Sequence, residues 1–283
     1  MRVLVFGRTG QVARALARYD GVTCLDRAAA DLTDPAACAD VITNAAADVI
    51  INAAAFTAVD QAEAEAELAT MVNGTAVAAM AVAAAKRDLP FLHLSTDYVF
   101  DGSGTRPWRP DDATAPLGVY GRSKLQGEAG ARAAGGVYAI LRTSWVFSAF
   151  GANFVKTMLR LGAGRDELSI VNDQTGGPTA AADIAAALMV MARMFHAGKG
   201  VSGTYHFAGT PDVSWATFAT EIFKQADLRV TISGIPTTEY PTPAKRPLNS
   251  RLDCGLLADI FAIPRPDWRT GLKQVLLDLK DIK

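Results

Sequence analysis

Short apolar runs alternate with longer helix-like segments through the first half of the chain. The candidate strands are Val3–Phe6, Val22–Leu25, Asp48–Asn52, Pro90–Ser95 and Val137–Thr143. The helix-like segments between them are about Gln11–Tyr19, a helix starting at Asp34-Pro35, Ala62–Arg87 and Val119–Ala133. Continuous apolar strands are typical of a parallel sheet that is buried on both faces. The alternation therefore predicts right-handed crossovers and a doubly wound α/β fold.

Beyond about residue 145 the pattern is less regular. It predicts helices at Asn153–Leu161, Ala180–His196 and Trp215–Gln225, and a strand at Thr204–Phe207. The segment 233–253 contains Pro236, Pro241, Pro243 and Pro247, which indicates an extended loop. We expect residues 1–145, with parts of 146–210, to form the sheet domain. Residues from about 146 to 283 would form a small C-terminal lobe interleaved with it.

Composition narrows the class of protein. The length of 283 residues fits one large domain, or a domain with a smaller lobe. A formal net charge of −1 provides no basic field for nucleic acid or an anionic membrane. Cys24, Cys38 and Cys254 show no paired spacing, which argues against disulfides and zinc and favours a reducing compartment. We find no run approaching the roughly 20 apolar residues of a membrane span, and expect a cytoplasmic protein.

The first predicted strand leads into a glycine-rich turn, Gly7-Arg8-Thr9-Gly10-Gln11-Val12-Ala13. In dinucleotide-binding folds the first glycine allows a tight turn, and the next lets a pyrophosphate approach the backbone. The following helix offers free N–H groups to the phosphates. A glycine pattern alone is weak evidence. Its position between the first strand and the first helix favours a dinucleotide site of the Rossmann type.

The second strand ends in two opposing signals, Asp26 and Arg27. A carboxylate at this point suits the ribose 2′-hydroxyl of NADH, whereas a guanidinium suits the 2′-phosphate of NADPH. Either NADPH or NADH is therefore expected, although two solvated charges at a strand end would give the same pattern. The third strand ends in Asn52-Ala53-Ala54-Ala55, whose small side chains leave room for a cofactor or simply pack closely.

Tyr120 and Lys124 are the candidate catalytic pair, because a spacing of four places both on one helix face. A nearby ammonium favours the phenolate and would lower the pKa of the tyrosine toward the working pH. Thr96 follows the fourth strand, at the sheet edge where such folds bind ligands. An exposed amphipathic helix would also contain such a pair, but the three residues together on a dinucleotide fold predict an active site.

Several sequence motifs, spread over nearly the whole chain, resemble those of a known family. They are Gly7–Val12, Asn52–Glu63 (NAAAFTAVDQAE), Ser95–Gly102 (STDYVFDG), Val119–Gly127 (VYGRSKLQG), Arg142–Phe147 (RTSWVF), Asn172–Thr179 (NDQTGGPT) and Arg246–Leu252 (RPLNSRL). On these segments the chain resembles the extended short-chain dehydrogenase/reductases, and within them the reductases of dTDP-linked keto sugars. The last four segments are more specific than the glycine loop, so the resemblance narrows the substrate.

The resemblance implies an NAD(P)H-dependent reduction of the C4 keto group of a dTDP-4-keto-6-deoxyhexose, with dTDP-L-rhamnose as the expected product. Tyr120 would donate the proton, Lys124 would hold the nicotinamide ribose and tune Tyr120, and Thr96 would bind the keto oxygen. The implied cofactor contacts, besides Tyr120 and Lys124, are Gly7, Gly10, Gln11, Val12, Asp26, Arg27, Asp31, Leu32, Ala53, Ala54 and Thr57. Asp97, Tyr98 and Trp145 would line the sugar pocket, although Trp145 could equally be a core aromatic.

Arg246 and Asn249 lie on a proline-stiffened loop, where a guanidinium and an amide could hold the substrate diphosphate. A solvated crossover without function is the alternative for this loop. Two other functions remain open on the same fold. One is a nucleotide-sugar epimerase, dehydratase or ketoreductase with another sugar; a dehydratase would need an acid pair where this chain has Asp97 and Tyr98. The other is a non-catalytic regulatory subunit, which would not need Thr96, Tyr120 and Lys124 intact.

One departure from the family concerns a metal ion. Some reductases of this family dimerise around a metal held by glutamates, and aligning the motifs puts those positions at Ala15 and Ala182. Alanine offers no oxygen ligand to a hard cation such as Mg²⁺. Asp183 would take the role only if the alignment slips by one residue, because the next helical position is rotated by about 100°. We therefore expect no metal and a monomer or weak homodimer.

Overall fold

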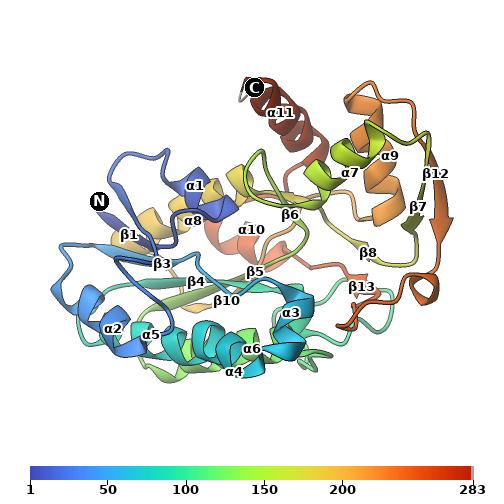
Figure 1. The fold of residues 1–283 in the computed structure, drawn as a ribbon. Helices are drawn as coiled ribbons and strands as arrows, with labels where there is room; N and C mark the ends of the chain where they lie inside the picture. The colour runs from blue at the N-terminus through green and yellow to red at the C-terminus, as the bar shows by residue number, and fades with distance from the viewer. Residues whose placement is uncertain (282–283) are drawn as a thin grey trace.

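A six-stranded parallel sheet lies at the centre of the computed structural model, which describes residues 1–281 (Figure 1). Its strands are β1 Val3–Phe6, β2 Val22–Leu25, β3 Val49–Asn52, β4 Phe91–Thr96, β5 Tyr138–Thr143 and β10 Gly203–His206. They lie in the order β10-β5-β4-β3-β1-β2, and every neighbouring pair is parallel. The predicted doubly wound parallel sheet is confirmed.

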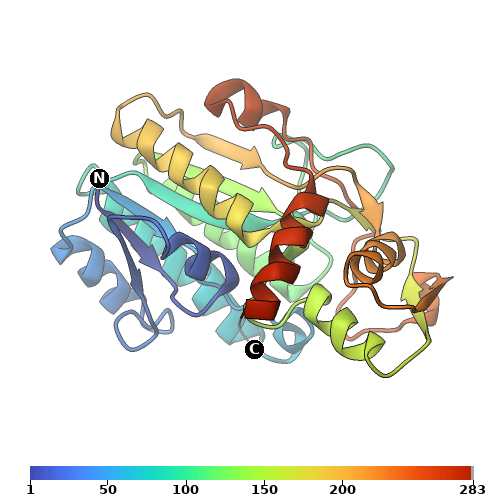
Figure 2. The same ribbon diagram turned by 90° about the horizontal axis from the view of Figure 1, so that it is seen from above.

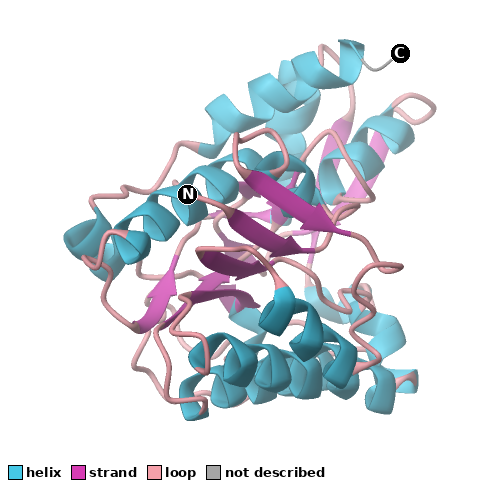
Figure 3. Ribbon diagram, turned by 90° about the vertical axis from the view of Figure 1, so that its left-hand side faces the viewer, coloured by secondary structure: helices cyan, strands magenta, loops and turns pink. Residues whose placement is uncertain are grey.

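Helices cover both faces of the sheet (Figures 1 and 3). One face carries α1 Gln11–Leu16, α8 Ala181–His196 and α10 Gly255–Phe261, and the other carries α2 Pro35–Asn44, α5 Ala76–Ala85 and α6 Val119–Ala133. On β1, Val3 and Val5 belong to the first core. Leu4 and Phe6 belong to the second. Successive strand residues point to opposite faces, so a strand buried on both sides has to be apolar throughout.

The strand order reverses between β1 and β3, because the chain leaves β1 for the edge strand β2 and returns on the other side. Such a reversal opens a crevice at the carboxyl ends of the strands. Gly7 follows β1 there with a φ of +110°. A Cβ on Gly7 would come within 3.3 Å of the backbone of Ala53 and Ala54. The two loops thus meet at this crevice, and only glycine fits.

The helix expected at Ala62–Arg87 is divided. It consists of α3 Val59–Ala64, α4 Ala66–Thr70, the π-helical turn η1 Met71–Thr75 and α5. Contrary to expectation, one helical stretch among the described residues, Ala66–Ala85, is long and apolar enough to cross a membrane by length and composition. Half of that window is buried inside the protein, and α5 packs against α2 and α6. A core helix passes the same test, so this finding is weak evidence for a membrane span.

The C-terminal half adds a lobe beside the sheet (Figure 2). The expected helices form as α7 Phe154–Gly162, α8 and α9 Trp215–Gln225, and α11 Trp268–Asp281 joins them. The other strands are β6 Val146–Phe147, β7 Glu167–Val171, β8 Thr175–Gly176, β9 Thr179–Ala180, β11 Val213–Ser214, β12 Thr231–Ile235 and β13 Asn249–Ser250. The segment 233–253 is therefore not wholly a loop, since it contains the end of β12 and all of β13. The lobe has its own core around Phe218 and Trp268.

Candidate active site

The position of helix α6 is fixed by contacts at its first turn. Glu63 accepts a hydrogen bond from the backbone N–H of Val119 at 2.8 Å, which satisfies a free donor of the helix N-terminus. Gly121 has no side chain, and a Cβ there would collide with the carbonyl oxygen of Tyr98. Tyr98 belongs to the short 3-10 helix η2 Asp97–Val99, directly after β4. These contacts bring Tyr120 beside Thr96, as the sequence analysis expected.

Tyr120 differs electrostatically from the expectation. Burial raises its pKa, the charges of Asp97 and Tyr98 raise it further, and a hydrogen bond with Thr96 lowers it. The predicted lowering by Lys124 is therefore wrong for the protein without its cofactor. The amino group of Lys124 instead donates to the carbonyl oxygen of Leu94 at 2.6 Å. Burial of the phenol dominates, and the tyrosine stays protonated.

Lys124 is itself buried, and burial lowers its pKa to about 8. The charge of Glu128, one turn further along α6, raises it. Glu128 accepts from Arg142 at 2.8 and 2.7 Å and from the hydroxyl of Ser95 at 2.6 Å. A buried carboxylate is stable only when paired in this way. Glu128 thus joins α6 to Ser95 on β4 and Arg142 on β5, one helical turn beyond Lys124.

Asp97 carries an unsatisfied polar atom at the site. The residue is 3% exposed, and its Oδ1 accepts a hydrogen bond from Thr96 at 3.1 Å. Its Oδ2 is buried and has no hydrogen-bond partner in the part of the chain that the structure describes. Burial raises the pKa of Asp97 to about 6, while the neighbouring hydroxyls of Ser250 and Thr96 lower it. This oxygen is thus able to accept a hydrogen bond from a group that enters the site.

Trp145 has an uncommon backbone conformation for a non-glycine residue, with a φ of +48°. Its ring stacks on Trp215 with a centroid distance of 3.5 Å and an interplanar angle of 10°. A Cβ on Gly176 would come within 2.9 Å of the ring. Backbone conformations of this kind concentrate at functional sites. The half-buried ring thus packs in the lobe and also lies at the carboxyl end of β5.

Arg246 lies beside Tyr98, but its guanidinium is already paired. Its Nη2 donates to Asp60 at 2.6 Å, and Nη1 lies 3.5 Å from the hydroxyl of Tyr98. Asp60 also accepts from the backbone of Ala244 at 3.1 Å. Asp60 therefore holds the loop and its guanidinium beside Tyr98. Sequence reasoning did not single out Asp60 or Glu63, although both lie in the segment NAAAFTAVDQAE.

The expected role of Asn249 needs correction. It is 2% exposed, and its amide nitrogen donates to the carbonyl oxygens of Ser103 and Arg106 at 3.3 and 2.8 Å. Its amide oxygen accepts from the backbone and the guanidinium of Arg251. Both ends of the amide are used within the protein, so Asn249 joins two loops and is not available to bind a diphosphate.

The expected cofactor edge contains a second arginine that the sequence analysis missed. Arg8 pairs with Asp26 at 3.0 Å, and Arg27 pairs with Asp31 at 3.0 Å. A cation from the glycine turn therefore faces the carboxylate at the end of β2. Of the other expected contacts, Val12 and Leu32 are buried and Thr57 is exposed.

The residues of the glycine turn fit a dinucleotide. Gly10 is the N-cap of α1 and makes no side-chain cap hydrogen bond, which leaves the first N–H groups of the helix uncapped. The side chain of Gln11 turns away to Ser148 and Asn153, whose donors lie 2.8 and 3.0 Å from its oxygen. Gln11 thereby ties α1 to the loop after β6 while its backbone stays at the turn.

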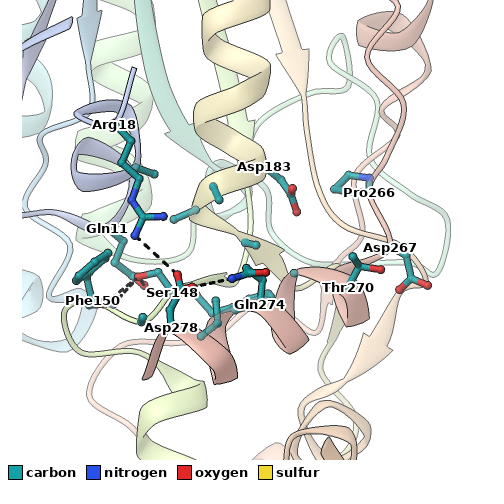
Figure 4. Close-up of a pocket in the computed structure, with 18 residues that line it drawn as sticks. Gln11, Arg18, Ser148, Phe150, Asp183, Pro266, Asp267, Thr270, Gln274 and Asp278 are labelled. Carbon is teal, nitrogen blue, oxygen red and sulfur yellow. Dashed lines mark hydrogen bonds and ion pairs between the residues drawn. The ribbon is translucent and has the colours of Figure 1, made fainter. Parts of the chain in front are cut away.

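A cavity of about 450 Å³ lies between α1, α8 and α11, apart from Tyr120 and Lys124 (Figure 4). Ala15 and Ala182 both line it, so the two positions aligned with metal-binding glutamates do converge. Asp183 also lines it, and Arg18 lies 3.7 Å from Asp278 across it. Among residues 1–281, no group of three or more His, Cys, Asp or Glu side chains could hold a metal ion. Alanine at positions 15 and 182 supplies no oxygen ligand to such a metal ion.

Comparison with known proteins agrees with this geometry. The family model described as the RmlD substrate binding domain matches residues 1–280. The dTDP-4-dehydrorhamnose reductase of Sinorhizobium fredii is 44% identical, over 99% of this chain and 100% of that protein. The chain belongs to the dTDP-4-dehydrorhamnose reductase family. The resemblance inferred from the motifs is confirmed.

Other members of the dTDP-4-dehydrorhamnose reductase family support the assignment. The reductase of Escherichia coli K12 is 41% identical, over 99% of this chain and 98% of that protein. The solved structure of the Bacillus anthracis reductase in complex with NADP is 33% identical, with a TM-score of 0.90, and covers 98% of this chain and 99% of that chain.

Proposed function

We propose that this chain is a nucleotide-sugar reductase that converts dTDP-4-dehydrorhamnose (dTDP-4-dehydro-6-deoxy-L-mannose) to dTDP-L-rhamnose with NADPH or NADH. The observation that carries the proposal is the meeting of Thr96, Tyr120 and Lys124 at the carboxyl end of β4, in a member of this reductase family. The chain is then an oxidoreductase that acts in the biosynthesis of nucleotide sugars, which is part of carbohydrate biosynthesis.

Tyr120 is the proton donor in this proposal, and its environment suits that role. A raised pKa keeps the phenol protonated at neutral pH, as a general acid for carbonyl reduction requires. The hydroxyl of Thr96, which donates to Asp97 in the structure, turns to donate to the keto oxygen of the sugar. A dihydronicotinamide held by these residues would supply the hydride for C4 of the sugar. Lys124, whose amino group is anchored on Leu94, holds the nicotinamide ribose.

For the cofactor, the proposal uses the crevice between β1 and β3. Gly7, Gly10, Gln11 and Val12 hold the pyrophosphate, with Ala53, Ala54 and Thr57 along the facing edge. Asp26, Arg27, Asp31 and Leu32 surround the adenosine. Arg8 pairs with Asp26 and Arg27 pairs with Asp31, so the two positive and two negative charges are balanced. A 2′-phosphate would therefore not be repelled by net negative charge, and a 2′-hydroxyl could still bind a carboxylate. This balance supports use of both NADPH and NADH.

For the sugar nucleotide, the proposal places Asp97, Tyr98 and Trp145 around the sugar. The orphaned Oδ2 of Asp97 supports a hydrogen bond to a sugar hydroxyl. Arg246 binds the diphosphate, and in doing so exchanges part of its bond with Asp60. A guanidinium that is already held in place loses little conformational freedom on binding.

The wider organisation is proposed on the same basis. Residues 1–145, with parts of 146–210, bind the cofactor, and residues from about 146 to 283 complete the substrate pocket. We also propose a cytoplasmic, metal-independent monomer or weak homodimer. The alanines at positions 15 and 182 support the absence of a metal-linked dimer.

The test is a reaction of the protein with dTDP-4-keto-6-deoxy sugars and either dihydronicotinamide cofactor. We expect one dihydronicotinamide to be oxidised, as followed by its absorbance, for each dTDP-6-deoxyhexose formed. We also expect a much lower rate in Tyr120→Phe. Product formation without net cofactor consumption would indicate an epimerase or dehydratase. Absence of turnover together with a tight protein partner in a pull-down would indicate the regulatory-subunit alternative.

A further inference from the structure

Three buried polar side chains form a chain of contacts behind the catalytic pair. Asn52 ends β3, His93 lies on β4 and Lys124 lies on α6, and they are 0%, 0% and 2% exposed. Asn52 Nδ2 lies 3.1 Å from His93 Nδ1, and His93 Nε2 lies 3.3 Å from Lys124 Nζ. The proposed mechanism uses only Lys124, so Asn52 and His93 have no role in it.

The orientation of the Asn52 amide determines the direction of these hydrogen bonds. The backbone N–H of Ala54 donates to Asn52 Oδ1 at 3.1 Å, so the amide nitrogen faces His93. An amide nitrogen only donates, which makes His93 Nδ1 an acceptor. Complete burial lowers the pKa of His93 well below its usual value, so the ring is neutral whichever form Lys124 takes. Its single proton is then on Nε2 and points toward Lys124.

The form of Lys124 that accepts this bond is the uncharged amine. An ammonium has three donors and no acceptor, so it opposes an incoming N–H. A neutral amine uses its lone pair for His93 Nε2–H and one N–H for the carbonyl oxygen of Leu94 at 2.6 Å. One N–H then remains free. Burial lowers the pKa of Lys124 and so also favours the uncharged amine. The charge of Glu128, which Arg142 holds from β5, raises this pKa.

We propose that His93, locked in its Nε2–H tautomer by Asn52, is a positioning residue that stabilises the uncharged form of Lys124 and aims its one free N–H. The opposite tautomer would require the Asn52 amide to turn, which would set its nitrogen against the N–H of Ala54. Ala53 and Ala54 also form the expected cofactor edge. The consequence for catalysis rests on the proposed function, but the hydrogen-bond arrangement does not.

The tautomer is directly measurable by ¹⁵N NMR of histidine-labelled protein, without cofactor or substrate. The chain has three histidines, and His206 provides an internal control. His206 Nδ1 lies 3.0 Å from the carbonyl oxygen of Trp108 and must donate, while its Nε2 lies 3.4 Å from Arg142 and accepts. We expect opposite tautomers, with the proton on Nε2 in His93 and on Nδ1 in His206. A His93 ring protonated on Nδ1, or on both nitrogens, overturns the proposal.

The effect on Lys124 is tested by titrating its ¹³Cε resonance, identified as the signal absent from Lys124→Met. His93→Gln replaces the N–H donor with an amide that can turn its oxygen toward an ammonium. We expect about a tenfold higher proton affinity of Lys124 in this variant. His196→Gln, the loss of an exposed histidine at the end of α8, should leave the titration unchanged. An unchanged titration in His93→Gln, or equal shifts in both variants, overturns the proposal.

If His93→Gln does not fold, the tautomer of His93 and the titration of Lys124 in the native protein remain the test. A His93 ring protonated on Nδ1, or a Lys124 that titrates as an ordinary exposed lysine, overturns the proposal. None of these measurements uses reductase activity. A protein that lacks the proposed reaction but shows the expected tautomers would therefore refute the function and leave this inference standing.

Discussion

Asp97→Asn should raise the free energy of unfolding relative to that of the native chain as the pH increases from acidic to neutral. Asp97 is 3% exposed and one of its oxygens has no partner, so its ionised form is disfavoured by burial. Its pKa is raised from 3.8 to about 6, which corresponds to roughly 3 kcal/mol against the native state once the group is ionised. The native state binds this proton more tightly than the unfolded chain. Stability from Asp97 is therefore fully present below the unfolded pKa and is lost as the pH rises to about 6.

Urea unfolding of the native chain and Asp97→Asn, measured at several pH values, tests this reasoning. Between about pH 4 and about pH 7 the free energy of unfolding of the variant should gain roughly 2 kcal/mol on the native chain. The cost of burying the new amide is the same at each pH and cancels in this comparison. Parallel stability curves would show that Asp97 titrates normally and would refute its assignment as a buried, unsatisfied carboxyl.

Four other outcomes are expected. Tyr120→Phe should lower turnover by roughly 10²–10⁴-fold with cofactor binding nearly intact, and a near-normal turnover number would remove it from the mechanism. Lys124→Ala should lower both turnover and cofactor affinity, measured by steady-state kinetics and cofactor titration. Arg27→Ala and Arg8→Ala should each weaken NADPH more than NADH in cofactor titrations; equal effects would place these arginines away from the adenosine ribose. Activity should survive chelator treatment, and light scattering at micromolar concentration should give a mass near 29.8 kDa, whereas a stable dimer that dissociates on chelation would contradict the reading of Ala15 and Ala182.

The sheet could be predicted because its strands are buried on both faces and read as continuous apolar runs. The lobe strands could not. In β7, Glu167 and Ser169 are exposed and alternate with apolar residues, and β12 contains Gly234, so neither strand forms such a run. The helix expected at Ala62–Arg87 is divided at Glu65 and contains a π-helical turn. Helix propensity does not reveal such breaks, because they follow from tertiary contacts.

Within the site, residue types and spacing predicted that Thr96 and Tyr120 lie together, and the structure places them side by side. Their protonation could not be inferred, since the pKa of Tyr120 depends on burial that spacing does not show. Asn249 was misassigned because an amide on a loop gives no sign of which carbonyl groups it will meet. Arg8 was overlooked because its partner, Asp26, follows another strand.

The most direct test of the proposed reaction uses NADPH deuterated at the transferring position of its nicotinamide, with dTDP-4-dehydrorhamnose as substrate. The account predicts dTDP-L-rhamnose carrying one deuterium at C4 for each NADPH oxidised, and no such product from Tyr120→Phe on the same timescale. Deuterium at another carbon, or conversion of the sugar without oxidation of NADPH, would contradict it.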